Sequence, residues 1–191
     1  RQVSSAASDV YKRQYNNSGY YLLGMIIESA SDQAWHEYMH ETFFASIGME
    51  HTRVGSNTDI IPNRVQGYEF KGGELANDDL IGMNQPGAAG ALIASAGDLI
   101  RWQMALVDGR AVSPESYEQM TTVTTLADGS ERPYGFGLGL GDRFDRPSVG
   151  HGGGINGFNS MIAYFPEDEL GIAIISNSQG FSAGRLTTQM A

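Results

Sequence analysis

A histidine followed by three glycines, His151-Gly152-Gly153-Gly154, combines one titratable side chain with a bare stretch of backbone. The block follows a short apolar approach at Ser148-Val149 and precedes a segment rich in strand formers that begins near Phe158. Bare backbone lets a ligand come close, and preorganised N–H donors stabilise the charge that develops on an acyl carbonyl oxygen. The block therefore indicates either an oxyanion hole or a glycine-rich turn with an incidental histidine.

A second candidate for chemistry is His36-Glu37-Tyr38-Met39-His40, which has the H-E-x-x-H pattern of zinc peptidases. On a helix this spacing places two imidazoles one turn apart on the same face, with the glutamate near a metal-bound water. A catalytic zinc also needs a third protein ligand. The downstream candidates form no recognisable third-ligand motif: Glu41, His51, Asp59 and Glu69. We expect His36 and His40 to be solvated and no metal to be bound, with a zinc peptidase as an alternative.

The composition limits the classes of protein and partner. The chain has 191 residues, 41% of them hydrophobic, which suits one domain with its own core. Its net charge of −10 repels phosphate backbones and anionic lipid, so we expect a small-molecule or peptide substrate and no nucleic acid. No apolar run is long enough for a membrane span, and the absence of cysteine excludes disulfides, thiol catalysis and cysteine metal sites.

Helical patterns position the first candidates. Apolar residues recur at the spacing of one helical face between Leu23 and Ala30, which predicts a helix over about 18–30 with Asn17 or Ser18 as its N-cap. Three further helices are predicted: about 33–46, closed by Gly48; from Ser95 or Asp98 to Gly109; and from Ser113-Pro114 onward. Residues 50–90 show no clean period.

Strand patterns dominate the last third of the chain. Strands are predicted over Tyr134–Leu140, Phe158–Phe165 and Leu170–Ser176, and the last two form a hairpin through the turn at 166–169. Because no linker or repeat separates the helical part from the strand part, the sequence predicts one α+β unit.

Residues 1–14 differ from the rest of the chain. They lack the apolar middle of a signal peptide, and the run SSAASDVYKRQ resembles the in-frame translation of a sequencing adapter. We interpret 1–14 as a non-native scar or a disordered tail, so that the domain covers 15–191 and the chemistry starts at Tyr15.

Four segments together resemble the serine beta-lactamase and penicillin-binding-protein superfamily, in its class C, DD-peptidase and esterase-like branch. They are Tyr15–Gly24, with its Tyr-x-Asn pattern; Ile47–Thr52; Gly90–Leu99; and Gly150–Gly154 followed by Gly157-Phe158. The resemblance covers about 15–180. It implies a beta-lactamase/transpeptidase-like α+β fold, in which an antiparallel sheet flanked by helices meets a helical subdomain at the site.

The resemblance also implies roles for individual residues. Tyr15 matches the tyrosine of the proton-transfer network, and Asn17 matches the asparagine that orients the catalytic lysine and the substrate, although its local alternative is the helix cap. His151 stands where many beta-lactamases have lysine. Gly154, with Gly153 beside it, matches the position that supplies a backbone N–H to the oxyanion hole. The family's chemistry needs no cofactor.

The family's nucleophile lies in a Ser-x-x-Lys motif N-terminal to the Tyr-x-Asn region. No serine in this sequence is followed by lysine three residues later. The resemblance therefore implies that this sequence is the C-terminal part of a serine hydrolase and that the N-terminal part of the domain is missing from it. We expect these 191 residues to form no acyl-enzyme.

The intact hydrolase would cleave an amide, lactam or ester bond through an acyl-enzyme. His151 favours peptides or esters over beta-lactams, because a neutral imidazole holds a carboxylate less well than an ammonium group does. A non-catalytic binding or regulatory domain of the same fold is the alternative from another class. Members of the family are often exported or anchored, which suggests a periplasmic or extracytoplasmic protein.

Overall fold

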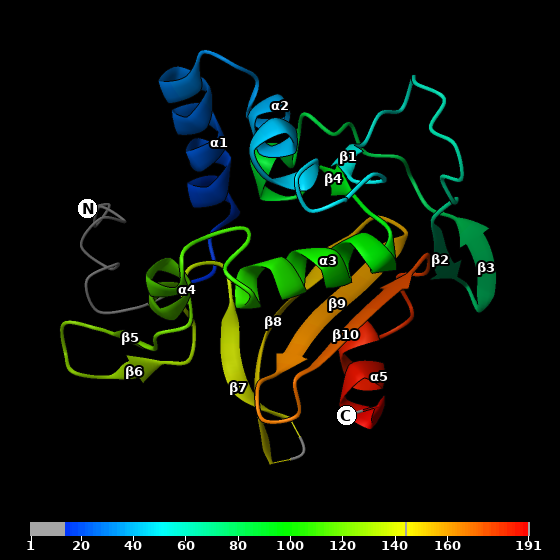
Figure 1. Ribbon diagram of the computed structural model, residues 1–191. Helices are drawn as coiled ribbons and strands as arrows, with labels where there is room; N and C mark the ends of the chain where they lie inside the picture. Colours follow the sequence, from blue (N-terminus) through cyan, green and yellow to red (C-terminus); the bar gives the residue numbers. More distant parts are fainter. Residues whose placement is uncertain (1–13, 144, 191) are drawn as a thin grey trace, which may run out of the picture.

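One antiparallel sheet forms the centre of the computed structural model, which describes residues 14–143 and 145–190 (Figure 1). Its four strands lie in the order β10-β9-β8-β7. Their bounds are Gly139–Arg143 for β7, Arg146–Ile155 for β8, Phe158–Phe165 for β9 and Leu170–Ser176 for β10. The predicted hairpin of the last two strands is confirmed, since all of β10 pairs antiparallel with residues 159–165 of β9.

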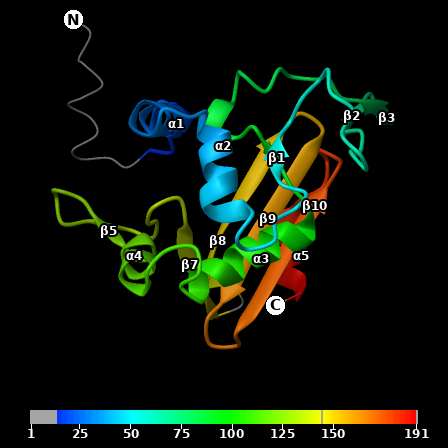
Figure 2. The same ribbon diagram turned by 45° about the horizontal axis from the view of Figure 1, so that its top comes forward.

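Helices α3 (Ala96–Val107) and α5 (Ala183–Met190) cover opposite faces of this sheet (Figures 1 and 2). The alternation along β10 shows the two faces, because Gly171 lies against side chains of α3 whereas Ile172 joins the core beneath α5. That core contains Met161, Ala163, Phe165, Ile172 and Ala183. Helix α5 was not predicted from the sequence.

A second apolar core joins α3 to helix α2 (Trp35–Met39) and the π-helix η2 (His40–Phe44). Its buried members are Phe44, Ile47, Met49 and Ala105. The helix predicted over 33–46 is confirmed in place, although its second half is π-helical, and Gly48 follows it with a positive φ of 74°.

The predicted helix starts at Ser95 and Ser113 are also confirmed. The Ser95 hydroxyl caps α3 by accepting a hydrogen bond from the backbone N–H of Asp98 at 3.1 Å. The Ser113 hydroxyl caps α4 (Pro114–Met120) in the same way through the N–H of Ser116 at 3.2 Å. Helix α1 covers Asn17–Ser31, close to its predicted range, but its N-cap is Asn16 rather than Asn17 or Ser18.

The apolar face of α1 is largely exposed. Leu23 and Ile26 keep 49% and 60% of their surface in contact with solvent. The helix instead rests on the short 3-10 helix η3 (Gly87–Ala89) through Gly24, where a Cβ atom would lie 2.5 Å from the Cβ of Ala88. The spacing of apolar residues therefore predicted helix α1 correctly, but the apolar face of this helix is not part of either core.

The strand predicted over Tyr134–Leu140 is wrong in its first half, because β7 begins only at Gly139. Gly137 has φ +75°, which interrupts an extended strand. A Cβ atom on Gly135 would lie 1.8 Å from the carbonyl oxygen of Met120, so the segment packs directly on the end of α4. The chain before β7 thus leaves the sheet, with one isolated bridge between Tyr134 and Gly139.

Residues 50–90 and the outer loops contain three two-stranded ribbons. They pair β1 (Arg53–Val54) with β4 (Leu92–Ile93), β2 (Tyr68–Lys71) with β3 (Glu74–Asn77), and β5 (Thr124–Thr125) with β6 (Glu131–Arg132). None of the described helices is long and apolar enough to cross a membrane. The tail predicted over 1–14 lies outside the described residues, apart from Gln14.

Candidate active site

The structure brings Tyr15 and His151 together although 135 residues separate them. Tyr15 immediately precedes Asn16, the cap of α1, and His151 lies near the middle of β8. Their rings stack with centroids 6.0 Å apart and planes inclined by 27°. His151 pairs in register with Ile162 on β9, which places its side chain on the face of the sheet opposite Met161 and Ala163 of the α5 core.

Tyr134 is a further site residue, and sequence analysis missed it. Its hydroxyl lies 2.9 Å from Nε2 of His151, and the two rings meet edge to face with centroids 5.8 Å apart. The other imidazole nitrogen, Nδ1, lies 2.6 Å from the carbonyl oxygen of Gly152. The only sequence signal at this position is the alternating pattern of Tyr134–Leu140, which predicts a strand and does not indicate a contact with His151.

The glycine block lies on an open part of the sheet. Strand β7 pairs with β8 only as far as Gly150, so among the described residues the stretch His151–Ile155 has a strand partner on the β9 side alone. The residues of this stretch line the pocket, and the edge away from β9 has no neighbouring strand within the described part of the chain. A ligand can therefore reach the backbone here, and the block is a strand segment rather than a turn.

Packing does not explain the glycine block. A Cβ atom on Gly153 would lie 2.5 Å from the hydroxyl oxygen of Ser160, which can rotate away, and its next neighbour is at 3.9 Å. On Gly152 or Gly154 a Cβ atom would meet its nearest neighbour at 3.6 or 3.8 Å, which is ordinary contact. The bare backbone at these two positions is not explained by packing, and both line the pocket.

Asn17 also lines this pocket. Because Asn16 caps α1 through a 3.2 Å hydrogen bond from the N–H of Gly19, the local alternative for Asn17 as the helix cap is wrong. Asn17 occupies the first position of the helix and is exposed. Tyr15, Asn17, His151 and the glycines thus surround one cavity.

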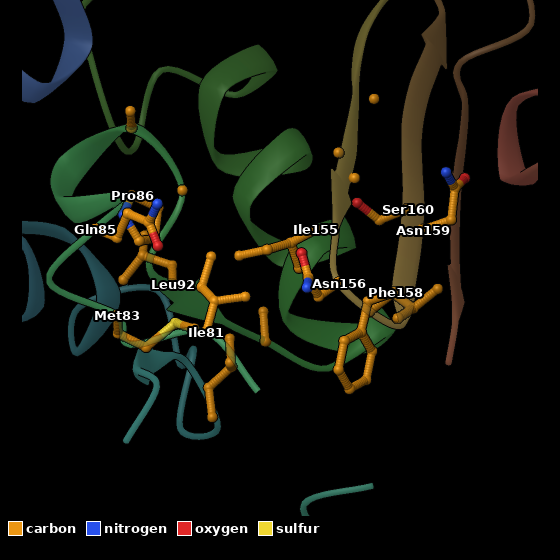
Figure 3. Close-up of a pocket in the computed structure, with 18 of the residues that line it drawn as sticks. Ile81, Met83, Gln85, Pro86, Leu92, Ile155, Asn156, Phe158, Asn159 and Ser160 are labelled. Atoms are coloured by element: carbon orange, nitrogen blue, oxygen red, sulfur yellow. The ribbon is translucent and has the colours of Figure 1, made fainter. Parts of the chain in front are cut away.

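The cavity measures about 1380 Å³, and one of its walls is apolar. Ile81, Met83 and Leu92 lie across from Ile155 and Asn156, which continue the glycine block (Figure 3). An apolar wall beside a histidine and exposed backbone is suited to a ligand that carries both a polar group and a hydrophobic side chain.

Charged and titratable side chains on the cavity wall include His51, Arg64 and Asp79. The backbone at His51 is fixed by the buried carboxylate of Asp98, which accepts a 2.9 Å hydrogen bond from the His51 N–H. The same oxygen accepts a 2.9 Å hydrogen bond from the Thr52 hydroxyl. Asp98 therefore ties the start of α3 to this part of the wall.

The H-E-x-x-H residues lie elsewhere, on α2 and at the start of η2. His36 and His40 are both exposed, as expected, and the His36 ring contacts Trp35 edge to face. Within residues 14–143 and 145–190, no group of three or more histidine, cysteine or acidic side chains is placed to hold a metal ion.

Comparison with known proteins identifies the family. The family described as Beta-lactamase matches residues 9–191. The chain belongs to the beta-lactamase family. This confirms the resemblance seen in the sequence, and the predicted beta-lactamase/transpeptidase-like fold is confirmed as well.

Individual relatives agree with this assignment. A D-aminopeptidase of Gluconobacter oxydans is 28% identical over 166 residues, which are 85% of this chain and 31% of that protein. The D-amino acid amidase of Ochrobactrum anthropi SV3 shares the fold, with a TM-score of 0.79 at 23% identity over 94% of this chain and 56% of that one. A penicillin-binding protein homologue from Pyrococcus abyssi gives a TM-score of 0.78 at 26% identity over 94% and 42%. This beta-lactamase-family chain thus spans about a third of the D-aminopeptidase and about half of the solved structures.

Proposed function

We propose that this chain supplies part of the active site of a serine hydrolase that cleaves amide bonds next to a D-amino acid residue through an acyl-enzyme. The observation that carries the proposal is the meeting of Tyr15, His151 and the exposed Gly152–Gly154 backbone around one cavity. Similarity to D-aminopeptidases supports the choice of substrate. Esters remain a secondary substrate class, and beta-lactams are disfavoured because His151 replaces the lysine.

In this proposal the nucleophile comes from a Ser-x-x-Lys segment that precedes Tyr15 in the longer protein. Two observations support it: the 191 residues contain no such motif, and the relatives are much longer than this chain. The serine oxygen attacks the substrate carbonyl while the lysine takes its proton. Tyr15 passes this proton from the lysine to the leaving amine, and water then attacks the acyl-enzyme ester, which releases the acid and returns one water proton to the serine oxygen.

The glycine block stabilises the intermediate in this scheme. The tetrahedral oxyanion accepts hydrogen bonds from the Gly154 N–H and from the N–H of the nucleophilic serine, with Gly153 shaping the strand between them. Asn17 holds the substrate amide and orients the lysine. The apolar wall at Ile81 and Leu92 takes the hydrophobic side chain of the substrate.

The test begins with the native coding sequence upstream of Tyr15. The complete protein is then assayed on D- and L-alanine p-nitroanilide, with p-nitrophenyl acetate and a chromogenic cephalosporin for comparison. Preferential turnover of the D-amide, abolished when the motif serine is replaced by alanine, is the expected result. The 191-residue chain serves as the matched control and is expected to remain unlabelled by a fluorescent serine-hydrolase probe.

Two outcomes contradict the proposal. Covalent labelling of the 191-residue chain would place a nucleophile within it. An intact upstream region without Ser-x-x-Lys would instead favour the second candidate, a non-catalytic binding domain.

A further inference from the structure

The hydrogen bonds of His151 define its protonation in the neutral state. A carbonyl oxygen only accepts hydrogen bonds, so the 2.6 Å contact with the Gly152 carbonyl requires a proton on Nδ1. In the neutral imidazole Nε2 then carries no proton and accepts a hydrogen bond from the Tyr134 hydroxyl at 2.9 Å. Both ring nitrogens are therefore occupied by the protein itself.

Tyr134 is held in place by its own surroundings. The Thr124 hydroxyl donates a 2.6 Å hydrogen bond to the Tyr134 carbonyl, and the N–H of Phe136 donates to the carbonyl of Met120 at 3.2 Å. The turn at Gly137, with φ +75°, lets the chain leave β7 toward α4. These contacts fix the backbone at Tyr134 and directly after it, and the Tyr134 hydroxyl lies 2.9 Å from Nε2 of His151.

The aromatic contacts extend this order to Tyr15. Tyr134 meets the His151 ring edge to face, and Tyr15 stacks on the same ring with an interplanar angle of 27°. Tyr15 is 55% exposed, and no hydrogen bond joins it to His151 among the described residues. The orientation of the imidazole ring therefore helps to determine the position of the Tyr15 ring.

We propose that Tyr134 is a positioning residue, whose hydroxyl occupies Nε2 of His151 and fixes the imidazole plane on which Tyr15 stacks. The Gly152 carbonyl selects the tautomer, and Tyr134 fills the remaining nitrogen. His151 then serves as an oriented wall rather than as a general base, because taking a proton from a nucleophile would first break the bond to Tyr134. The catalytic importance of this positioning rests on the proposed function, whereas the hydrogen-bond arrangement does not.

The test uses NMR of the 191-residue chain with ¹⁵N-labelled histidine, at a pH where imidazoles are neutral. The wild-type spectrum is expected to show His151 protonated on Nδ1, with the Nε2 resonance displaced toward the protonated range as in a hydrogen-bonded acceptor. In Tyr134→Phe, which keeps the ring but loses the hydroxyl, the Nε2 resonance is expected to move. His36, His40 and His51 provide internal references in the same spectrum.

A matched control comes from the other flanking ring. Tyr15→Phe removes a hydroxyl that makes no hydrogen bond to His151, so the Nε2 resonance is expected to stay where it is in the wild type. A backbone amide spectrum of each variant verifies that the fold is retained. An Nε2 resonance that does not move in Tyr134→Phe, or that moves equally in Tyr15→Phe, overturns the inference.

A second measurement reads the same nitrogen by its reactivity. Diethyl pyrocarbonate acylates unprotonated imidazole nitrogens, and peptide mass spectrometry gives the rate at each histidine. His151 is expected to react several-fold faster in Tyr134→Phe than in the wild type, with unchanged rates at His36 and His40. Equal rates at His151 overturn the inference. Because neither readout uses turnover, a failed hydrolase assay and a failed positioning role are distinguished.

Discussion

Replacement of Asp98 is expected to destabilise the chain far more than replacement of its ion-pair partner. The Asp98 side chain is fully buried and accepts hydrogen bonds from the His51 N–H, the Thr52 hydroxyl and Arg101, at 2.9, 2.9 and 3.1 Å. In Asp98→Ala the first two donors lose their partner inside the protein. An unsatisfied buried donor costs about 1–3 kcal/mol; the Thr52 hydroxyl is buried and the His51 N–H is part-buried, so the expected loss is about 2–4 kcal/mol.

The isosteric variant separates charge from hydrogen bonding. Asp98→Asn can keep its carbonyl oxygen toward His51 and Thr52, and turns its amide toward Arg101, whose side chain is 52% exposed. The ion pair is then lost and the buried amide N–H faces the guanidinium, which also only donates, so the expected cost lies between those of Arg101→Met and Asp98→Ala. Arg101→Met leaves the carboxylate with its hydrogen bonds from the His51 N–H and the Thr52 hydroxyl, so its cost is expected to be smaller than that of Asp98→Ala.

Urea unfolding followed by circular dichroism and tryptophan fluorescence measures these differences. Trp102 lies on α3 and reports the region directly. The expected order of unfolding free energy, from highest to lowest, is wild type, Arg101→Met, Asp98→Asn and Asp98→Ala. The reasoning is refuted if Arg101→Met costs as much as Asp98→Ala, since the ion pair rather than the hydrogen bonds from His51 and Thr52 would then hold this junction.

Three further predictions concern the glycines, the zinc pattern and the apolar wall. Gly150→Ala is expected to lower the melting temperature sharply, because the new Cβ would lie 2.0 Å from a backbone oxygen of β9. Gly154→Ala is expected to leave the melting temperature nearly unchanged. Equal effects of the two variants in thermal melts would contradict these contacts. Zinc content by mass spectrometry is expected to be the same in the wild type and in the double variant His36→Ala, His40→Ala, and one equivalent bound only by the wild type would revive the metal site. Ile155→Asp in the complete protein is expected to raise KM for D-phenylalanine amide about tenfold or more, because an unpaired carboxylate facing the apolar wall across the cavity costs more than about 1.4 kcal/mol; an unchanged KM would place the substrate side chain elsewhere.

The sequence predicted what depends on local pattern. The hairpin of β9 and β10, the caps at Ser95 and Ser113, and the end of the second helix near Gly48 follow from neighbouring residues, and the structure confirms them. For the glycine block, the sequence is compatible with both a turn and an oxyanion hole. The pairing of its backbone with β9 settles that it is strand, and this pairing depends on residues that local pattern does not connect.

Other features needed contacts between distant residues. Tyr134 was read as the start of a strand, because alternation of aromatic residues with glycine mimics the period of a half-buried strand. The turn at Gly137 and the close approach of Gly135 to α4 override that pattern. Likewise, the apolar stripe of α1 predicted the helix correctly, but a stripe does not specify what covers it, and Ile26 is exposed.

The segment before β7 turns away from the sheet, which leaves part of the β8 edge without a strand partner among the described residues. The same segment carries Tyr134, whose hydroxyl holds the His151 side chain on β8. An exposed strand edge is a template for unwanted pairing unless the protein blocks it. Here β7 stops pairing at Gly150, and the chain that precedes β7 turns away and brings Tyr134 to the His151 side chain. Tyr15 covers the face of the same imidazole. Side chains therefore crowd the His151 ring, whereas the glycines that follow carry no side chain, so close approach to the backbone is easiest at Gly152–Gly154, which line the cavity.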